Sequence, residues 1–367
     1  MVQTAQAHVD FEAERSAFQT TADEFVRRQV VPTLEQARSD RDCPRAVFDH
    51  AAEMGLLGVL APEALGGGGL DDPRFGELIV AAATQAGAPG TALALGLQSN
   101  VVIPAVVTGY VGTDGLAEAV ISGSTLVALA GHTGGITGVL TLSGLQLWGT
   151  AHGVVNATNA DKYLVIVEVA DAGRRAVMVD ARAAVVLPPA KVLGGQDAGS
   201  RDVVFDGVHV EADAVLSGEC SAVDELLIDA ALVFSAVGVA GARAAVAATV
   251  AYVQERKAFG RLVAEFENTQ SVLTTVWGEL VVAASFHDNC ARRRGLQELP
   301  LAEAGAGLQN SIAVYNKAVD CGVQLHGGYG YMLEYPIAQA YADARFVSLI
   351  AEAMTVPRSA LLADLGL

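Results

Sequence analysis

The sequence is short of positive charge, cysteine and long apolar runs. It has 23 Lys and Arg against 41 Asp and Glu, a formal net charge of −18, so it has no broad basic face for nucleic acid or an anionic membrane. Its four cysteines lie far apart, without zinc or disulfide spacing, which indicates a reduced, cytoplasmic protein. The most apolar run, between Asp229 and Arg243, is too short to span a bilayer and predicts a buried helix.

What is present predicts a large folded core. Hydrophobic residues make up 52% of the chain and charged residues 17%, a composition that excludes intrinsic disorder. Helical patterns occupy residues 1–122, short Val, Ile and Leu runs separated by turn residues occupy residues 123–218, and long helical patterns return over residues 219–367. This order predicts an α+β protein: an N-terminal helical domain, a central antiparallel β domain and a C-terminal helical bundle.

The segment ERKAFGRLVAEFENTQ, Glu255–Gln270, is the first candidate for a binding site. Arg256 and Lys257 end a predicted helix and are followed by Phe259 and a glycine. An arginine fork can hold a phosphate in two hydrogen bonds while the aromatic ring supports a flat group. The alternative is an ordinary helix C-cap, because basic residues and glycine are common there.

The segment QLHGGYGYMLEYP, Gln324–Pro336, is the second candidate. Its paired glycines would let backbone amides approach a pyrophosphate, although a plain interhelical turn has the same composition. His326 is interpreted as structural. The seven histidines show no ligand spacing with one another or with cysteine, so no metal site is expected. The sequence also has no phosphate-binding P-loop and no nucleophile elbow.

Taken in order, these segments resemble the acyl-CoA dehydrogenase family over nearly the whole chain. GLLGVLAPEALGGGG, residues 55–69, resembles an element near the end of the family's N-terminal helices, and DVVFDGVHVEADAVL, Asp202–Leu216, resembles the strand that closes its β domain. The two candidate segments resemble its C-terminal domain. The resemblance implies an N-terminal helical domain, a central β domain and a C-terminal four-helix bundle, with FAD bound at a subunit interface.

The family's contacts to a neighbour's FAD are present. In the family, the arginine and phenylalanine of R-x-x-F-G reach across the dimer to the ADP part of the neighbour's FAD, and here they correspond to Arg256 and Phe259. The glutamine and glycines of Q-x-H-G-G serve the same ADP part, and they correspond to Gln324, Gly327 and Gly328. The resemblance therefore implies that these five residues bind cofactor.

The contacts to the chain's own flavin differ from the family pattern. The family has a T-E-P and G-S-D stretch on the first strand, where this chain has ALAGHTGGITG, Ala128–Gly138. The family's W-I-T element corresponds to Gly153, Val154 and Val155. Trp148 is then expected to pack in the β domain instead of stacking on flavin.

The catalytic base is the largest departure. Aligned without gaps through Arg358, the family's glutamate falls on Ala351, and Glu352 takes the place of the following glycine. A shift of one residue would make Glu352 the base, but it also turns the side chain by about 100° around the helix axis. Some relatives carry the base on the first C-terminal helix, where the aligned residue is about Ala230, next to Asp229.

Three functions follow from the resemblance. The first is a non-catalytic subunit of a heteromeric FAD-dependent acyl-CoA dehydrogenase, which desaturates an acyl-CoA or acyl-carrier thioester and passes electrons to an acceptor. This subunit would complete the FAD site of a catalytic partner in a heterotetramer. The second is a self-sufficient homo-oligomeric enzyme that uses Glu352. The third is a flavin-free scaffold or acyl-thioester-binding protein. In each oligomer, the Ala-rich stretch 226–253 is expected to bury area between subunits.

Overall fold

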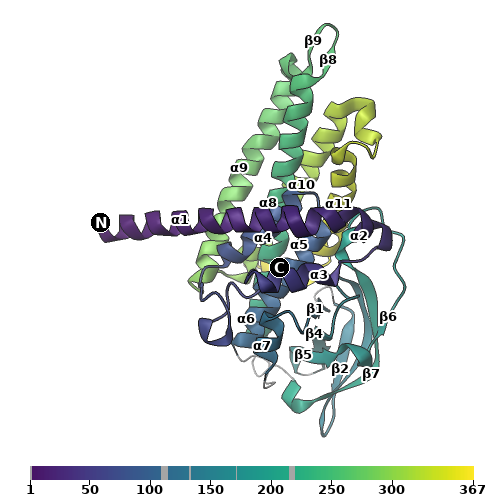
Figure 1. Ribbon diagram of the computed structural model, residues 1–367. Coiled ribbons are helices and arrows are strands. Elements are labelled where there is room, and N and C mark those ends of the chain that lie inside the picture. The colour runs from purple at the N-terminus through teal and green to yellow at the C-terminus, as the bar shows by residue number, and fades with distance from the viewer. Residues whose placement is uncertain (1, 109–114, 132–133, 171, 215–219) are drawn as a thin grey trace.

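The computed structural model describes residues 2–108, 115–131, 134–170, 172–214 and 220–367. Helices fill the N-terminal part, strands the middle and long helices the C-terminal part, and the sheet lies at one end of the long helices (Figure 1). The predicted α+β order of the chain is confirmed. The predicted first boundary, at residue 122, falls between the last N-terminal helix and the first strand. The second, at residue 218, falls outside the described residues.

Short helices build the N-terminal part. They are α1 (Val2–Phe25), α2 (Leu34–Asp40), α3 (Arg45–Glu53), α4 (Pro73–Gln85), α5 (Pro89–Gly96), α6 (Ile103–Val107) and α7 (Leu116–Ile121). After α1 the chain continues as a π-helix, Val26–Val30, and Pro32 opens a short 3-10 helix. Phe18 packs edge-on against Phe75, with ring centroids 5.9 Å apart, so α1 is fixed to α4 by aromatic contact.

The sheet is mixed, so the prediction of a purely antiparallel β domain was wrong. Its strands are β1 (Val127–Ala130), β2 (Ile136–Leu140), β3 (Gly144–Val154), β4 (Lys162–Val169), β5 (Gly173–Asp180), β6 (Val185–Val186) and β7 (Arg201–Glu211). The pairs β2–β3, β3–β7, β4–β5 and β6–β7 are antiparallel, whereas β1 and β2 both pair with β4 in parallel. The reason is that β1 and β2 follow one another along the same edge of β4.

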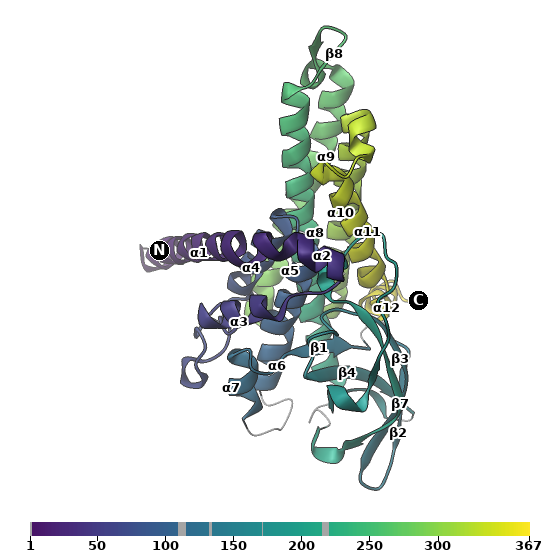
Figure 2. The same ribbon diagram turned by 45° about the vertical axis from the view of Figure 1, so that its right-hand side comes forward.

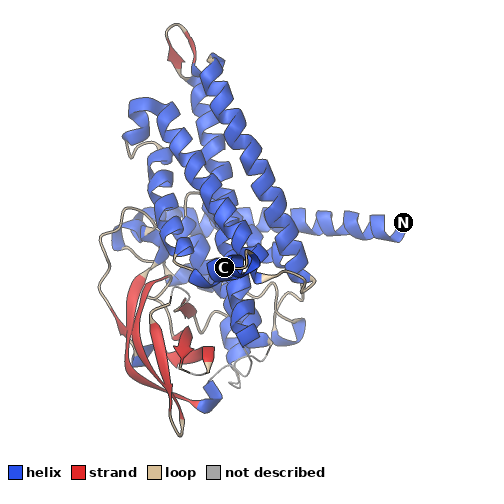
Figure 3. Cartoon of the chain, turned by 180° about the vertical axis from the view of Figure 1, so that it is seen from behind, coloured by secondary structure: helices blue, strands red, loops and turns tan. Residues whose placement is uncertain are grey.

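The C-terminal helices form an elongated bundle, seen beside the red strands in Figure 3. They are α8 (Cys220–Glu255), α9 (Glu267–Gly295), α10 (Leu301–His326), α11 (Pro336–Glu352) and the short α12 (Thr355–Asp364). Between α8 and α9 lies a small hairpin of β8 (Lys257–Ala258) and β9 (Arg261–Leu262). It forms the far tip of the bundle, away from the sheet (Figures 1 and 2).

The long helix α8 is the centre of its own chain and not a subunit surface, contrary to the expectation for residues 226–253. Most of its side chains from Leu226 to Val253 are buried. Gly241 explains the close packing, because a Cβ there would lie 2.4 Å from the Tyr315 ring of α10. Ala222–Glu255 and Pro89–Val107 are long and apolar enough for a membrane span, but 89% of each apolar window is buried within the protein, as in core helices.

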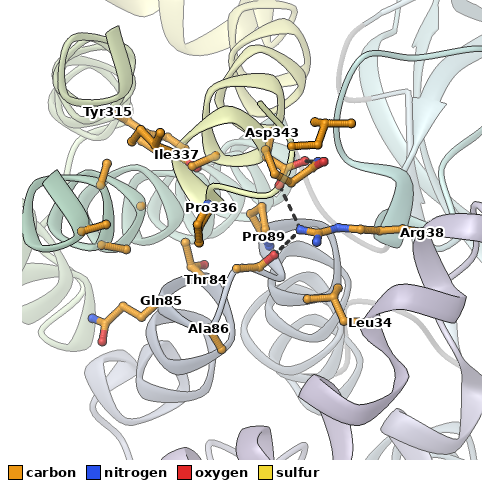
Figure 4. Close-up of a pocket in the computed structure, with 18 of the residues that line it drawn as sticks. Leu34, Arg38, Thr84, Gln85, Ala86, Pro89, Tyr315, Pro336, Ile337 and Asp343 are labelled. Atoms are coloured by element: carbon orange, nitrogen blue, oxygen red, sulfur yellow. Dashed lines mark hydrogen bonds and ion pairs between the residues drawn. The ribbon is translucent and has the colours of Figure 1, made fainter. Parts of the chain in front are cut away.

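The carboxylate of Asp343 on α11 joins all three parts of the chain. Its Oδ1 accepts a hydrogen bond from the Gly195 amide of the β domain at 2.8 Å, and its Oδ2 lies 3.3 Å from Nη2 of Arg38 on α2. Nearby, the buried Asp197 carboxylate accepts the Thr91 amide at 2.8 Å. Figure 4 shows Arg38 meeting Asp343 at the wall of a cavity of about 380 Å³. Burial, followed by the Asp197 charge, raises the pKa of Asp343 from 3.8 to about 7.

Asp343 should therefore make stability depend on pH. The folded carboxyl keeps its proton up to about pH 7, whereas the unfolded one releases it near 3.8, so the free energy of unfolding falls as pH rises through this window. We expect Asp343→Asn, which stays neutral, to reduce the fall in Tm of the wild-type protein between about pH 5 and pH 8. Thermal melts at several pH values test this, with the exposed Asp364→Asn as control. An unchanged pH slope in Asp343→Asn would contradict the assignment.

Candidate functional site

The tip of the bundle presents an aromatic ring to solvent. The β8–β9 hairpin turns through Phe259 and Gly260, both with positive φ, at 50° and 84°. Positive φ at both central residues is the signature of a type I′ turn. The Phe259 side chain is 99% exposed. Covering this ring would remove apolar surface from water, so the ring is available for contact with another group.

Arg256 lies directly below this hairpin, at the end of α8. Its guanidinium lies 5.2 Å from the centre of the Tyr329 ring, and no carboxylate pairs with it in the part of the chain that the structure describes. Gln324, near the end of α10, is exposed, as are Gly327 and Gly328 in the turn that follows. The structure thus brings all five predicted cofactor residues to one end of the bundle.

An aromatic cluster supports this surface. His326 is buried and stacks on Tyr252 with ring centroids 4.0 Å apart, and Tyr335 packs edge-on against both rings. Nδ1 of His326 lies 2.7 Å from the Gly322 carbonyl oxygen. Burial lowers the pKa of His326, so its ring is neutral at neutral pH. Its role here is to connect α8 to the end of α10.

A second hollow, here called the α11 cleft, lies at the other end of the bundle. It has a volume of about 460 Å³ and lies between the end of α11, the end of β3 and the loop 187–202. Ile350 faces Gly153 across it, since a Cβ on Gly153 would lie 3.7 Å from Ile350 Cγ1. At the rim, His152 Nδ1 lies 2.9 Å from Asp202 Oδ2, and the Gly153 amide donates to Asp202 Oδ1 at 2.9 Å.

The segments that replace the family's flavin contacts offer little to a flavin. Val154 and Val155 are buried in the core, so neither side chain faces the α11 cleft. Trp148 is half-exposed on β3 and does not line the cleft. Within Ala128–Gly138, residues 132 and 133 lie outside the described residues.

Glu352 points to the opposite side of α11. Ala351, at the aligned base position, is buried in the helical core. Glu352 lines a cavity of about 340 Å³, between α10 and the start of α12, together with Ala351, Asn316 and Arg358. The α11 side chains that line the cleft are instead those of Phe346, Leu349, Ile350 and Ala353. Glu352 and the α11 cleft are therefore on different faces.

Asp229, the alternative base, is already paired. Arg294 of α9 holds it through two contacts, Nε to Oδ1 at 2.5 Å and Nη2 to Oδ2 at 2.9 Å, and also contacts Glu225. The three residues line a small cavity of about 70 Å³ that is distinct from the α11 cleft. Its neighbour Ala230 is buried. Burial raises the pKa of Asp229 although Arg294 lowers it, but Arg294 occupies both carboxylate oxygens and Asp229 does not line the α11 cleft.

Comparisons with known proteins agree with the resemblance. Residues 12–123 match the family described as "Acyl-CoA dehydrogenase, N-terminal domain", and residues 222–351 match "Acyl-CoA dehydrogenase, C-terminal domain". The chain is 27% identical to the "Long-chain specific acyl-CoA dehydrogenase, mitochondrial" of Rattus norvegicus, over 91% of this chain and 82% of that protein. It is 25% identical to the benzylmalonyl-CoA dehydrogenase of Aromatoleum aromaticum, over 92% and 94%.

Solved structures share the fold. An acyl-CoA dehydrogenase from Geobacillus kaustophilus superposes with a TM-score of 0.86 at 20% identity, covering 96% of this chain and 98% of that one. A glutaryl-CoA dehydrogenase from Mycobacterium smegmatis, described as a complex with FADH2, has a TM-score of 0.84 at 18% identity, covering 96% and 94%. The family and these neighbours indicate FAD as the cofactor.

The two tip glycines should respond differently to alanine. Gly327 has φ 59° and ψ −134°, a region that L-residues rarely adopt, so Gly327→Ala should lower the free energy of unfolding by about 1–3 kcal/mol. Gly328 has no positive φ and open space at its Cβ position, so Gly328→Ala should change stability by less than about 0.5 kcal/mol. Urea denaturation of both variants tests this, and equal stabilities would contradict the turn geometry.

Proposed function

Because the chain belongs to the acyl-CoA dehydrogenase family, we propose that it is the non-catalytic subunit of a heteromeric acyl-CoA dehydrogenase, completing the FAD site of a catalytic partner. One observation carries the proposal. Arg256 and its neighbours face outward at the bundle tip, whereas the end of α11 presents no carboxylate to the α11 cleft. We also propose that the complex is a cytoplasmic heterotetramer, that its substrate is an acyl thioester, and that it passes electrons to an electron-transfer acceptor.

The tip fits the ADP part of FAD. Arg256 is a cation without a carboxylate partner among the described residues, in a chain with a large excess of acid. The turn at Gly327 and Gly328 is open to an approaching phosphate, because nothing lies within 4 Å of a Cβ built on either residue. Phe259 is free to contact a flat ring. The β8–β9 hairpin lies at the end of the bundle away from the sheet (Figures 1 and 2), whereas the α11 cleft adjoins the sheet, so these groups suit a cofactor held by a neighbour.

The other half of the reaction is missing. FAD, when bound, supplies the hydride acceptor, while a carboxylate of the protein must take the α-proton of the thioester. Ala351 at the aligned position cannot do so, and Glu352 faces α10 and α12. Loss of a general base costs roughly 10²–10⁴-fold in rate. Alanine at the aligned base position weighs against the homo-oligomeric alternative, and the exposed, unpaired tip weighs against a flavin-free scaffold.

FAD stoichiometry tests the shared site. We expect the complex of this chain with its catalytic partner to contain about one FAD per two chains. Arg256→Ala should weaken FAD binding roughly 10- to 150-fold, because a charge-assisted hydrogen bond contributes about 1.5–3 kcal/mol. Flavin absorbance after gel filtration and equilibrium dialysis measure both quantities. Arg292→Ala, an exposed arginine of α9 away from the tip, is the control. One FAD in the α11 cleft of every copy of this chain would refute the proposal.

Activity of the isolated chain separates the alternatives. We expect neither bleaching of added FAD by acyl-CoA nor turnover with an artificial electron acceptor, since the aligned base position is Ala351 and α11 presents no carboxylate to the α11 cleft. Glu352→Gln should leave the rate of the heteromeric complex unchanged. Ala351→Glu should restore activity only where a flavin already lies in the same chain. Strong turnover by the isolated chain that is lost in Glu352→Gln would establish the homo-oligomeric enzyme instead.

A further inference from the structure

The α11 cleft has apolar walls that its own chain leaves in solvent. Leu349 of α11 is 69% exposed, and Leu187 and Val192 on the opposite loop are 37% and 40% exposed. Pro188 and Ile350 complete the lining between them. A cavity of about 460 Å³ with such walls is in the usual size range of small-molecule sites. Covering these side chains would remove apolar surface from water and so favours an apolar occupant.

Two arginines and one carboxylate, that of Asp202, line the cleft. Arg41, which follows α2, and Arg201, at the start of β7, both line it. Neither forms an ion pair with a carboxylate in the described part of the chain, although the sequence has far more acidic than basic residues. Nη1 of Arg201 donates a hydrogen bond to the Ser200 carbonyl oxygen at 2.7 Å. Burial, and then the nearby Arg41 charge, lower the pKa of Arg201, while Asp42 opposes them.

Two backbone amides at the rim are occupied. The Gly153 amide donates to Asp202, and the Gly195 amide donates to Asp343 at 2.8 Å. A flavin ring, whose polar edge needs several hydrogen-bond donors, would find these two backbone amides already used. An anion with a single small head group would need only the guanidinium forks of Arg41 and Arg201.

We propose that the α11 cleft binds an amphipathic carboxylate of the fatty-acid class. The carboxylate lies at the Arg41 and Arg201 end, and the hydrocarbon chain lies along Leu187, Leu349 and Ile350. His152, whose Nδ1 is bonded to Asp202, lines the same cleft. In this subunit the cleft is a ligand site separate from the shared FAD site at the bundle tip.

Fluorescence titration of the purified full chain with cis-parinaric acid, an unbranched polyene carboxylate, tests the proposal. We expect saturable binding of one molecule per chain. Arg201→Gln should weaken it roughly tenfold or more, because one charge-assisted contact is lost, and Arg201→Lys should restore part of the affinity. Leu349→Gln should also weaken binding. The matched controls are Arg182→Gln, an exposed arginine that pairs with Asp180 outside the cleft, and Leu296→Gln, an exposed leucine beyond α9.

Three results would overturn the proposal. They are an absence of saturable binding, equal binding of the parinaric methyl ester with no effect of Arg201→Gln, and stoichiometric displacement of the probe by FAD. Displacement by FAD would assign the cleft to flavin and would also remove the shared-site function. The first two results would leave that function intact, since it depends on Arg256 and the partner's base. Failure of this inference is thus distinguishable from failure of the proposed function.

Discussion

The structure depends on one buried carboxylate, that of Asp343. It is the point where α11, the loop before β7 and the N-terminal α2 meet, and its oxygens accept hydrogen bonds from Gly195 and Gln339 and pair with Arg38. Buried acids remain only where such partners compensate the lost hydration. Because Asp343 fixes both the rotation of α11 and the position of the loop, it also fixes which α11 side chains face the α11 cleft.

That rotation determines the direction of Glu352, the acidic residue next to the aligned base position. Helical residues one apart differ by about 100° in direction, and α11 continues as a helix to Glu352. With Asp343, Phe346 and Ile350 turned toward the β domain, Glu352 turns toward α10. The same geometry places Leu349 in water at the cleft entrance. The direction of Glu352 and the apolar character of the cleft entrance thus follow from the same helix rotation.

The sequence was sufficient to predict the parts of the structure that depend on residues close together in the chain. Arg256 and Phe259 are three positions apart, so a helix end and a tight turn place them at one tip, and the α+β order followed from local patterns. The parallel pairing with β4 could not be predicted, because it depends on where strands distant in the sequence align. The Arg38 and Asp343 contact joins residues 305 positions apart. Arg41, His152 and Arg201 carry no common motif, and only the folded chain brings them together.

The bundle tip and the α11 cleft have one further property in common, an arginine without a carboxylate partner among the described residues. In a chain with a net charge of −18, most arginines near the core are paired, as Arg294 is with Asp229 and Arg74 with Asp72. A buried or half-buried cation without a partner loses part of its hydration, which costs free energy. A bound anion can offset this cost. Arg201 in the α11 cleft is such a cation, and Arg256, exposed at the opposite end of the bundle, is likewise without a carboxylate partner among the described residues. One end therefore suits a phosphate held by a neighbouring chain, and the other suits a small anion held by this chain alone.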